Sequence, residues 1–209
     1  DVIAQGMQER GISILTETNL AKIEKSSDSY KVTDTHARKA SFDLVMCATG
    51  RKPNSGDLGL KELGITMNSA GAVEVDAYSK TSLPSVYAIG DVTNRVNLTP
   101  VAIREGMAFV ETAFKDNPTP PDHSLIPSAV FTQPEYGTIG LSEEDARNQE
   151  PIEVYATTFK PMSTAFIADP QIVLMKLVVS QATRKILGCH IVADGAGEMI
   201  QMAGIAVKM

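Results

Sequence analysis

Two short segments of the sequence could bring a ligand close to the backbone. In each, an apolar run ends in glycine and a polar residue: Arg51 follows Gly50, and Asp91 follows Gly90. Glycine allows close approach to the backbone, and open parallel sheets bind ligands outside the carboxyl ends of their strands. The Asp91 carboxylate could then accept hydrogen bonds from sugar or ribityl hydroxyl groups. The alternative is that each glycine simply ends a strand and each polar side chain is solvated.

A helix start close to Asp91 favours the ligand interpretation. Thr99 and Pro100 predict a helix with threonine as its N-cap and proline in its first turn. The free amide groups and the positive dipole end of such a helix favour negative charge. A reduced flavin is anionic along its N1–C2=O edge, so it suits such a site. The pair alone fits a plain capped helix that faces water, but its place eight residues after Asp91 favours a ligand.

The nucleophilic and metal-binding residue types form no recognisable group. Cys47 and Cys189 lie far apart in the sequence within apolar runs, so we expect two buried, small apolar residues rather than a redox dithiol. His36, His123 and His190 are scattered without metal-ligand spacing and are expected on the surface or in packing. No nucleophile elbow, HExxH, P-loop or GxGxxG motif occurs. We therefore expect no metal site.

The elements that must position these residues follow from the hydrophobic pattern. Continuous apolar runs at Leu44–Ala48 and Val86–Ile89 predict strands buried on both faces of a parallel sheet. The proline cluster at 116–121 marks the best domain boundary, since proline can neither continue a helix nor occupy a central strand. Beyond it, we expect short strands, an antiparallel meander and a closing helix, at residues 129–132, 138–141, 154–159, 173–179, 187–192 and 197–209.

Composition and charge narrow the class of protein. The 209 residues are 43% hydrophobic and 21% charged, which is typical of a globular protein with one large or two modest domains. The net charge is −6 and no part of the chain is strongly basic, which disfavours nucleic acid and anionic membranes as partners. No apolar run reaches the roughly 18 residues of a membrane span, and no export signal is visible. Both ends lie inside helical patterns, so we expect a piece of a longer protein.

Five motifs in order resemble the pyridine nucleotide–disulfide oxidoreductase family. They span the whole chain and are Ala48-Thr-Gly-Arg-Lys-Pro-Asn54, Ser85-Val-Tyr-Ala-Ile-Gly-Asp91, Leu98-Thr-Pro-Val-Ala102, Ala129-Val-Phe-Thr-Gln-Pro134 and Gly137-Thr-Ile-Gly-Leu141. The branch of glutathione reductases is most similar, with trypanothione reductases close to it. Lipoamide dehydrogenases usually place His rather than Pro after the loop, so Thr99-Pro100 favours the glutathione branch.

The resemblance implies an α/β and α+β fold in three parts. Residues 1–52 would be the closing half of the NADPH-binding domain, and residues 53–122 the central, returning segment of the FAD-binding domain. Both would be partial Rossmann-like domains. Residues 123–209 would form a truncated α+β dimerisation domain with a mainly antiparallel sheet. We expect its meander and its helix at 197–209 to associate with a second copy.

The resemblance also implies cofactors, a reaction and site residues. Electrons would pass from NADPH through FAD and an enzyme disulfide to glutathione disulfide, in a cytoplasmic homodimer. Asp91 would bind the ribityl chain, and Thr99 would approach the isoalloxazine ring. The implied FAD positions are Gly90, Asp91, Thr99 and Ala102, and the implied backbone contacts with NADPH are Gly50, Asn97 and Ala129. Met107 stands where some glutathione reductases place an arginine that binds a substrate carboxylate, so specificity would depend on other residues.

Several parts of the family's catalytic machinery have no counterpart in this sequence. The redox CxxxxC pair, the glycine motifs for FAD and NADPH and the phosphate-binding arginines would precede Asp1, and the acid/base histidine would follow Met209. The resemblance therefore implies that this chain holds no catalytic residue and is inactive alone. Two alternatives stay open: a reductase of another low-molecular-weight disulfide such as trypanothione, and a non-catalytic dimerisation module that binds no nucleotide.

Overall fold

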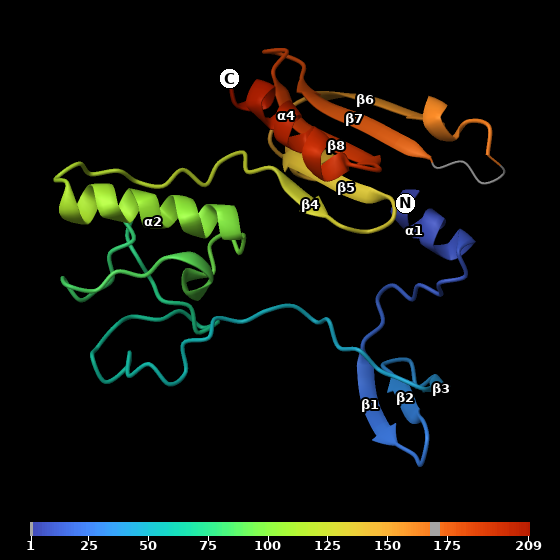
Figure 1. The fold of residues 1–209 in the computed structure, drawn as a ribbon, viewed down its shortest axis with the longest axis horizontal. Helices are drawn as coiled ribbons and strands as arrows, with labels where there is room; N and C mark the ends of the chain where they lie inside the picture. Colours follow the sequence, from blue (N-terminus) through green and yellow to red (C-terminus); the bar gives the residue numbers. More distant parts are fainter. Residues whose placement is uncertain (1, 168–171) are drawn as a thin grey trace. The chain divides into compact units, whose positions relative to one another are not determined.

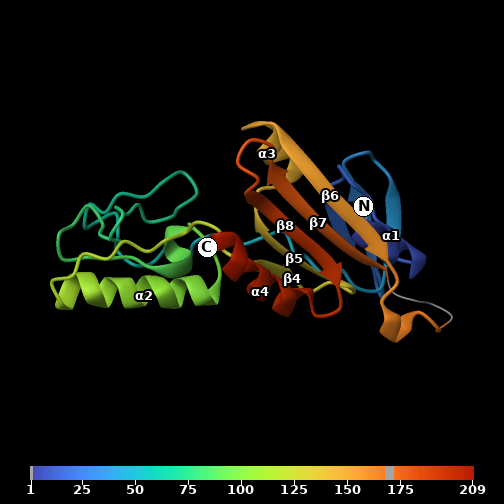
Figure 2. The same ribbon diagram turned by 90° about the horizontal axis from the view of Figure 1, so that it is seen from above.

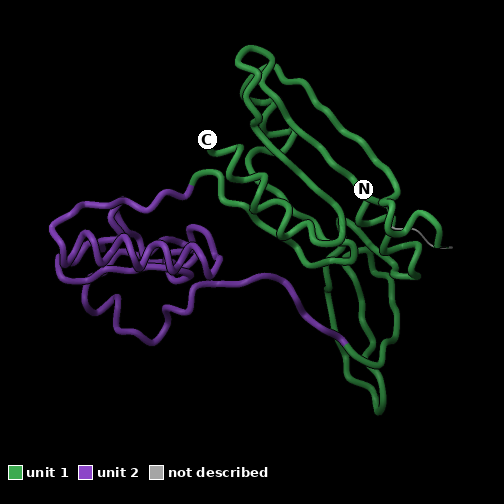
Figure 3. The backbone as a smooth tube through the Cα atoms, turned by 45° about the horizontal axis from the view of Figure 1, so that its top comes forward, with its two compact units in different colours: residues 1–44, 124–209 green, residues 45–123 purple. Residues whose placement is uncertain are grey.

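The computed structural model describes residues 2–167 and 172–209 and divides into two compact units (Figures 1 and 3). One unit combines residues 1–44 with residues 124–209, and the other is the continuous stretch 45–123. The division into domains after residues 52 and 122, expected from the sequence, stays a prediction. The two units are described separately.

The N-terminal part of the first unit is a short helix and a three-stranded antiparallel sheet. Helix α1 (Val2–Glu9) ends just before Gly11, whose φ of 84° suits the end of a helix. The strands, in sheet order, are β1 (Leu20–Lys25), β2 (Tyr30–Asp34) and β3 (Lys39–Phe42). The Ser26 N–H donates to the Ser29 carbonyl at 2.8 Å and closes the polar turn between the first two strands.

The C-terminal part is a five-stranded antiparallel sheet in the order β4-β5-β8-β7-β6. Its strands are β4 (Ser128–Val130), β5 (Glu135–Gly140), β6 (Ile152–Phe159), β7 (Val173–Ser180) and β8 (Ile186–Ala193). Helix α3 (Glu143–Arg147) follows β5, with the Ser142 hydroxyl accepting the Asp145 N–H as its N-cap, and the 3-10 helix η2 (Met162–Thr164) follows β6. The predicted meander is confirmed.

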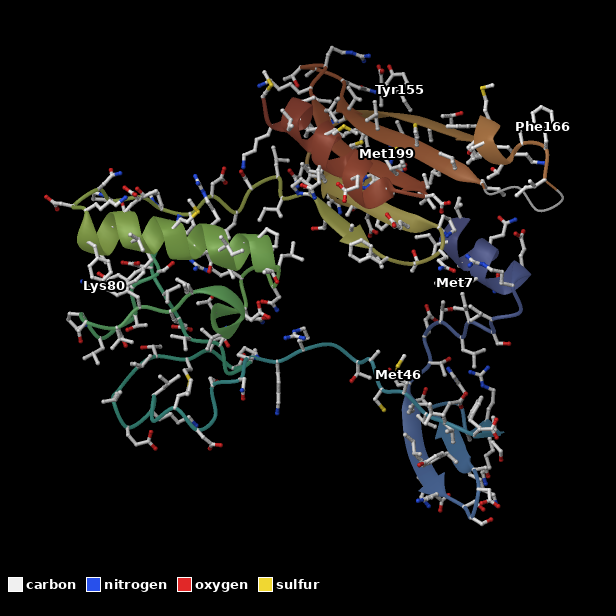
Figure 4. The ribbon with its side chains drawn as sticks, viewed as in Figure 1. Met7, Met46, Lys80, Tyr155, Phe166 and Met199 are labelled. Atoms are coloured by element: carbon white, nitrogen blue, oxygen red, sulfur yellow. The ribbon has the colours of Figure 1, made fainter. Side chains whose placement is uncertain are left out.

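Helix α4 (Ala196–Lys208) lies across one face of this sheet and builds the main core (Figures 1 and 2). Ala196 and Ile200 are fully buried in one cluster with Ile139 of β5. A glycine allows this close approach, because a Cβ at Gly137 would lie 2.5 Å from the Ala196 carbonyl oxygen. Met199, labelled in Figure 4, packs against the same cluster. Burial of this apolar face holds the helix on the sheet.

The second unit is built mainly of loops around one long helix. The 3-10 helix η1 (Gly90–Thr93) precedes helix α2 (Thr99–Phe114). Helix α2 turns Val101, Glu105 and Ala108 inward, at the spacing of a single helix face. The apolar residues buried in this unit are Ile65, Ala72, Val73, Val101 and Ala108.

Two predicted buried strands are wrong. Residues 44–48 form no strand, and Leu44 and Met46 are 78% and 85% exposed. Figure 4 shows Met46 on an extended segment. Residues 86–89 form no strand either, apart from an isolated bridge between Lys80 and Tyr87. An apolar run becomes a buried strand only where neighbouring strands pair with it, and the described residues provide no such neighbour for either run.

Candidate functional site

The loop after residue 89 lies directly on helix α2. Gly90 begins η1 with a φ of 70°, in the left-handed region that favours glycine. A Cβ added there would lie only 3.2 Å from the Cβ of Ala102 in the first turn of α2. One turn later, a Cβ at Gly106 would lie 3.5 Å from the Cδ1 of Ile89. Two of the predicted FAD positions, Gly90 and Ala102, are therefore in contact.

Asp91 follows Gly90 with its side chain about half exposed. It pairs with Arg51, whose Nη2 lies 3.5 Å from the Asp91 carboxylate oxygen. Both side chains are largely in solvent, where such pairs contribute at most about 1 kcal/mol. The contact places the two glycine-polar segments, 50–51 and 90–91, beside each other. The weakness of the pair leaves the carboxylate accessible to a ligand.

The start of α2 corrects the prediction by one residue. Leu98 is the N-cap, because its backbone is extended (φ −131°, ψ 134°), and Thr99 is already helical and caps nothing. Pro100 lies in the first turn, as predicted. The Leu98 carbonyl accepts the N–H groups of Val101 and Ala102, both at 3.0 Å. Since these two amides are engaged within the helix, its dipole is the main attraction that this end offers to an anion.

A buried carboxylate that no motif pointed to lies beneath the loop. Glu105 is 1% exposed and accepts hydrogen bonds from the Gly90 N–H at 2.5 Å and from His123 at 2.6 Å, and it pairs with Arg95 at 2.9 Å. The one signal in the sequence is its place four residues after Val101, on the inward face of a helix, where a charged side chain must find partners. His123, expected as a surface or packing residue, is instead half-buried and paired with this carboxylate.

The three positions implied for NADPH are spread over both compact units. Gly50 has a φ of 105° and open space where a Cβ would lie, which suits close approach of a ligand to the backbone. Asn97 is exposed and donates its side-chain N–H to the Oδ1 of Asn94 at 2.9 Å. Ala129 lies in β4 opposite Gly137 and belongs to the other unit.

The two cysteines lie in different surroundings and different units. Cys47 is exposed, which corrects the expectation of a buried residue, because its segment joins no sheet. Cys189 is buried in β8, and burial raises the pKa of its thiol. A raised pKa keeps a thiol protonated and a poor nucleophile.

His36 and His190 occupy the surface and packing positions expected for them. His36 is exposed, whereas His190 is 8% exposed on β8, and burial lowers its pKa. Its Nε2 donates to the Leu141 carbonyl at 3.1 Å, which leaves Nδ1 to accept from the Thr138 hydroxyl at 2.8 Å. Over residues 2–167 and 172–209, no cluster of His, Cys, Asp and Glu could hold a metal ion. None of the helices in these ranges has both the length and the apolar composition of a membrane span.

The chain matches two family models and several curated proteins. Residues 1–106 match the pyridine nucleotide-disulphide oxidoreductase family, and residues 126–209 match its dimerisation domain. Glutathione reductases of Pisum sativum and Burkholderia cepacia are 44% and 40% identical over 95% and 97% of this chain. A trypanothione reductase of Trypanosoma congolense is 39% identical over 95%. The chain spans 36%, 45% and 41% of these three relatives, less than half of each.

A solved structure has the same fold. The HOCl-induced flavoprotein disulfide reductase RclA from Escherichia coli matches with a TM-score of 0.86, over 98% of this chain and 47% of its own, at 22% identity. The structural match and the two family models confirm the predicted class, partial FAD- and NAD(P)-binding domains followed by an α+β dimerisation domain. The chain belongs to the pyridine nucleotide-disulphide oxidoreductase family.

Proposed function

We propose that this chain is the cofactor-holding and dimer-forming part of an NADPH-dependent flavoenzyme that reduces glutathione disulfide. The observation that carries the proposal is its identity of 38–44% to three glutathione reductases over 95–99% of the chain. Two trypanothione reductases share 39% and 42% over 95%, so trypanothione disulfide is the second candidate substrate. Met107 is exposed and uncharged, so other residues would select the substrate's charge.

The loop around Asp91 and the start of α2 fit a flavin cofactor. The positive φ of Gly90 and its close contact with Ala102 let the loop lie directly on the start of α2, which brings Asp91 close to this end of the helix. The accessible Asp91 carboxylate would accept hydrogen bonds from the hydroxyl groups of the flavin, and the dipole of α2, from Thr99 onward, would favour the anionic edge of its ring. When bound, FAD would take up hydride from NADPH and pass electrons to a disulfide. The residues of this chain would bind and orient it.

For NADPH we propose backbone contacts at Gly50, Asn97 and Ala129. Gly50 has the best support, since its positive φ and the open space beside it allow a ligand to approach. Asn97 lies exposed in the loop that leads into α2. Ala129 is proposed on the family resemblance alone.

Helix α2 has an exposed apolar stripe, which favours the proposal that further parts of a flavin-binding domain pack against it. Ile103, Met107, Val110 and Phe114 recur at helical spacing and are 41–75% exposed. Stripes of this kind mark surfaces that another element covers. We propose that the remainder of the FAD-binding domain, as present in the longer relatives, packs on this stripe.

We also propose that the protein is a homodimer in the cytoplasm. Residues 126–209 match a dimerisation domain, and α4 exposes Met202 and Ile205, each at 66%, on the face away from the sheet. A reaction that produces thiols belongs in a reducing compartment. The two cysteines, which form no disulfide within the described residues, fit such a compartment.

A segment exchange tests the proposed function. In the hybrid, this chain replaces the matching region of the Pisum sativum glutathione reductase, which supplies the rest of that protein. We expect the purified hybrid to show flavin absorbance, to oxidise NADPH with glutathione disulfide, and to prefer that substrate over trypanothione disulfide. A preference for trypanothione disulfide would contradict glutathione disulfide as the substrate and favour the second candidate. A folded hybrid without flavin would contradict the flavoenzyme and favour a non-catalytic dimerisation module.

A further inference from the structure

Glu105 is the most buried of the charged side chains that the structure describes, at 1% exposure. Burial of a carboxylate is unfavourable unless hydrogen bonds and opposite charge replace the water that it loses. Each oxygen of this carboxylate has its own partners. Oε2 accepts the Gly90 N–H at 2.5 Å, and Oε1 pairs with Arg95 at 2.9 Å and His123 at 2.6 Å. The carboxylate is therefore engaged on both sides.

These contacts belong to a closed ring of three hydrogen bonds and one ion pair around the start of η1. Besides the two contacts of Glu105 with Gly90 and Arg95, the Thr93 hydroxyl donates to the Gly90 carbonyl at 2.8 Å. The same hydroxyl accepts the Arg95 Nε–H at 3.2 Å. Both polar groups of Gly90, its N–H and its carbonyl, are thus fixed by side chains. The ring therefore holds both peptide groups that flank the Cα of Gly90, and the second of them leads into Asp91.

Two further contacts tie the ring to the rest of its unit. The Arg95 Nη2 donates to the hydroxyl of Ser79, which is 1% exposed, at 3.0 Å. His123, which contacts the same Glu105 oxygen as Arg95, is the last residue of the unit. The loop that carries Asp91 is therefore linked through one carboxylate to an inner loop and to the end of the unit.

We propose that Glu105 is a positioning residue for the flavin-binding loop and acts through Gly90 on Asp91. The inference rests on the function proposed above. Only a carboxylate satisfies all the donors, because both of its oxygens accept hydrogen bonds. A glutamine at 105 has one accepting oxygen and one NH₂ group. The NH₂ group would therefore point at another donor, either the Gly90 N–H on one side or Arg95 and His123 on the other. The charge of Glu105, and not only its shape, keeps the loop in place.

The test combines a measurement on the loop with a measurement on the cofactor. In the 209-residue chain, Glu105→Gln should raise the hydrogen-exchange rate of the Gly90 amide about tenfold or more and shift its proton resonance, since that N–H loses a charged acceptor. In the segment-exchange hybrid, the same variant should weaken FAD binding about tenfold. The matched control is Glu111→Gln on the same helix, whose carboxylate pairs with Lys115 at the surface. It should change neither value.

A second variant separates positioning from general stability. His123→Gln removes one partner of Oε1 and leaves the bond to Gly90 in place, so Gly90 exchange and FAD affinity should stay within about twofold of the wild type while the melting temperature falls. Equal Gly90 exchange in wild type and Glu105→Gln would overturn the inference. If the wild-type hybrid binds FAD and Glu105→Gln binds it equally well, the proposed function stands and the positioning role fails. If Gly90 loosens but no hybrid binds FAD, the flavin role fails and the ring remains a structural anchor.

Discussion

Asp91 combines a half-exposed carboxylate with a preceding residue, Gly90, whose N–H and carbonyl are both held by side chains of the ring. We expect Asp91→Asn to weaken FAD binding to the hybrid by about tenfold or more, because a hydrogen bond to a charged acceptor contributes roughly 1.5–3 kcal/mol. Titration by flavin fluorescence measures the affinity. Asp57→Asn removes an exposed carboxylate of the same unit and should leave the affinity unchanged. Equal losses in the two variants would contradict a specific contact.

His190 should make stability depend on pH. Burial lowers its pKa; the hydrogen bond to the Leu141 carbonyl opposes this shift, and the charge of Lys176 adds to it. Unfolding restores the usual value of 6.5, so below it the unfolded chain binds a proton that the folded chain does not. His190 therefore contributes its full share to the free energy of unfolding above pH 6.5. As the pH falls below this value, the free energy of unfolding decreases by up to about 1.4 kcal/mol per pH unit.

Urea denaturation between about pH 5 and pH 8 measures this effect. His190→Gln should flatten that part of the profile, whatever it does to stability at neutral pH. His36→Gln changes an exposed histidine and should keep the slope. The same slope in both variants would assign the pH dependence to another group.

The sequence singled out part of the candidate site, and the role of these residues in binding FAD stays a prediction. Gly90 and Asp91 were singled out by the apolar run before them, and Ala102 by the resemblance. Glu105 could not, because its partners lie 15, 10 and 18 positions away in the sequence and only the fold brings them together. His123, which contacts Glu105, could not be identified from the sequence for the same reason.

Gly137 is the point at which α4 approaches the sheet most closely, so it tests how the two elements dock. Its missing Cβ would lie 2.5 Å from the Ala196 carbonyl and 2.9 Å from the Cβ of Ile200. Gly137→Ala should lower the free energy of unfolding by roughly 1–3 kcal/mol, because the backbone of α4 must shift out of a packed core. Gly56→Ala, where nothing lies within 4 Å, should be close to neutral. Urea denaturation that finds the two variants equally stable would contradict this packing.

The accuracy of the sequence-based strand predictions depends on where each strand finds its partners. The meander strands β6, β7 and β8 pair with neighbours nearby in the chain, so the pattern of short apolar runs and turns was enough to predict them. The runs 44–48 and 86–89 have the composition of central parallel strands, but such strands depend on neighbours that are distant in sequence. Composition shows that a run prefers burial, and it does not show what will cover it.

Among the described residues, exposed apolar side chains gather on several surfaces, which include the stripe on α2, the extended segment at 44–48 and the outer face of α4. Isolated apolar residues on a surface need no explanation, but groups on one element do. Since the chain spans 36–48% of three glutathione reductases, the first two surfaces suit the parts that those proteins have in addition. The third lies in the part that matches a dimerisation domain.

A substitution on the outer face of α4 tests whether the protein forms a dimer through this helix. Ile205 is 66% exposed, while Ile200 on the opposite face is fully buried, so a charge at 205 should leave the fold intact. We expect Ile205→Glu to convert a dimer into monomers in light scattering, because an unpaired charge is costly inside an apolar interface. Gln149→Glu introduces the same charge on an exposed side chain outside α4 and should stay dimeric. Dimers in both variants would place the interface elsewhere, and a monomeric wild type at high concentration would contradict pairing of this chain through α4.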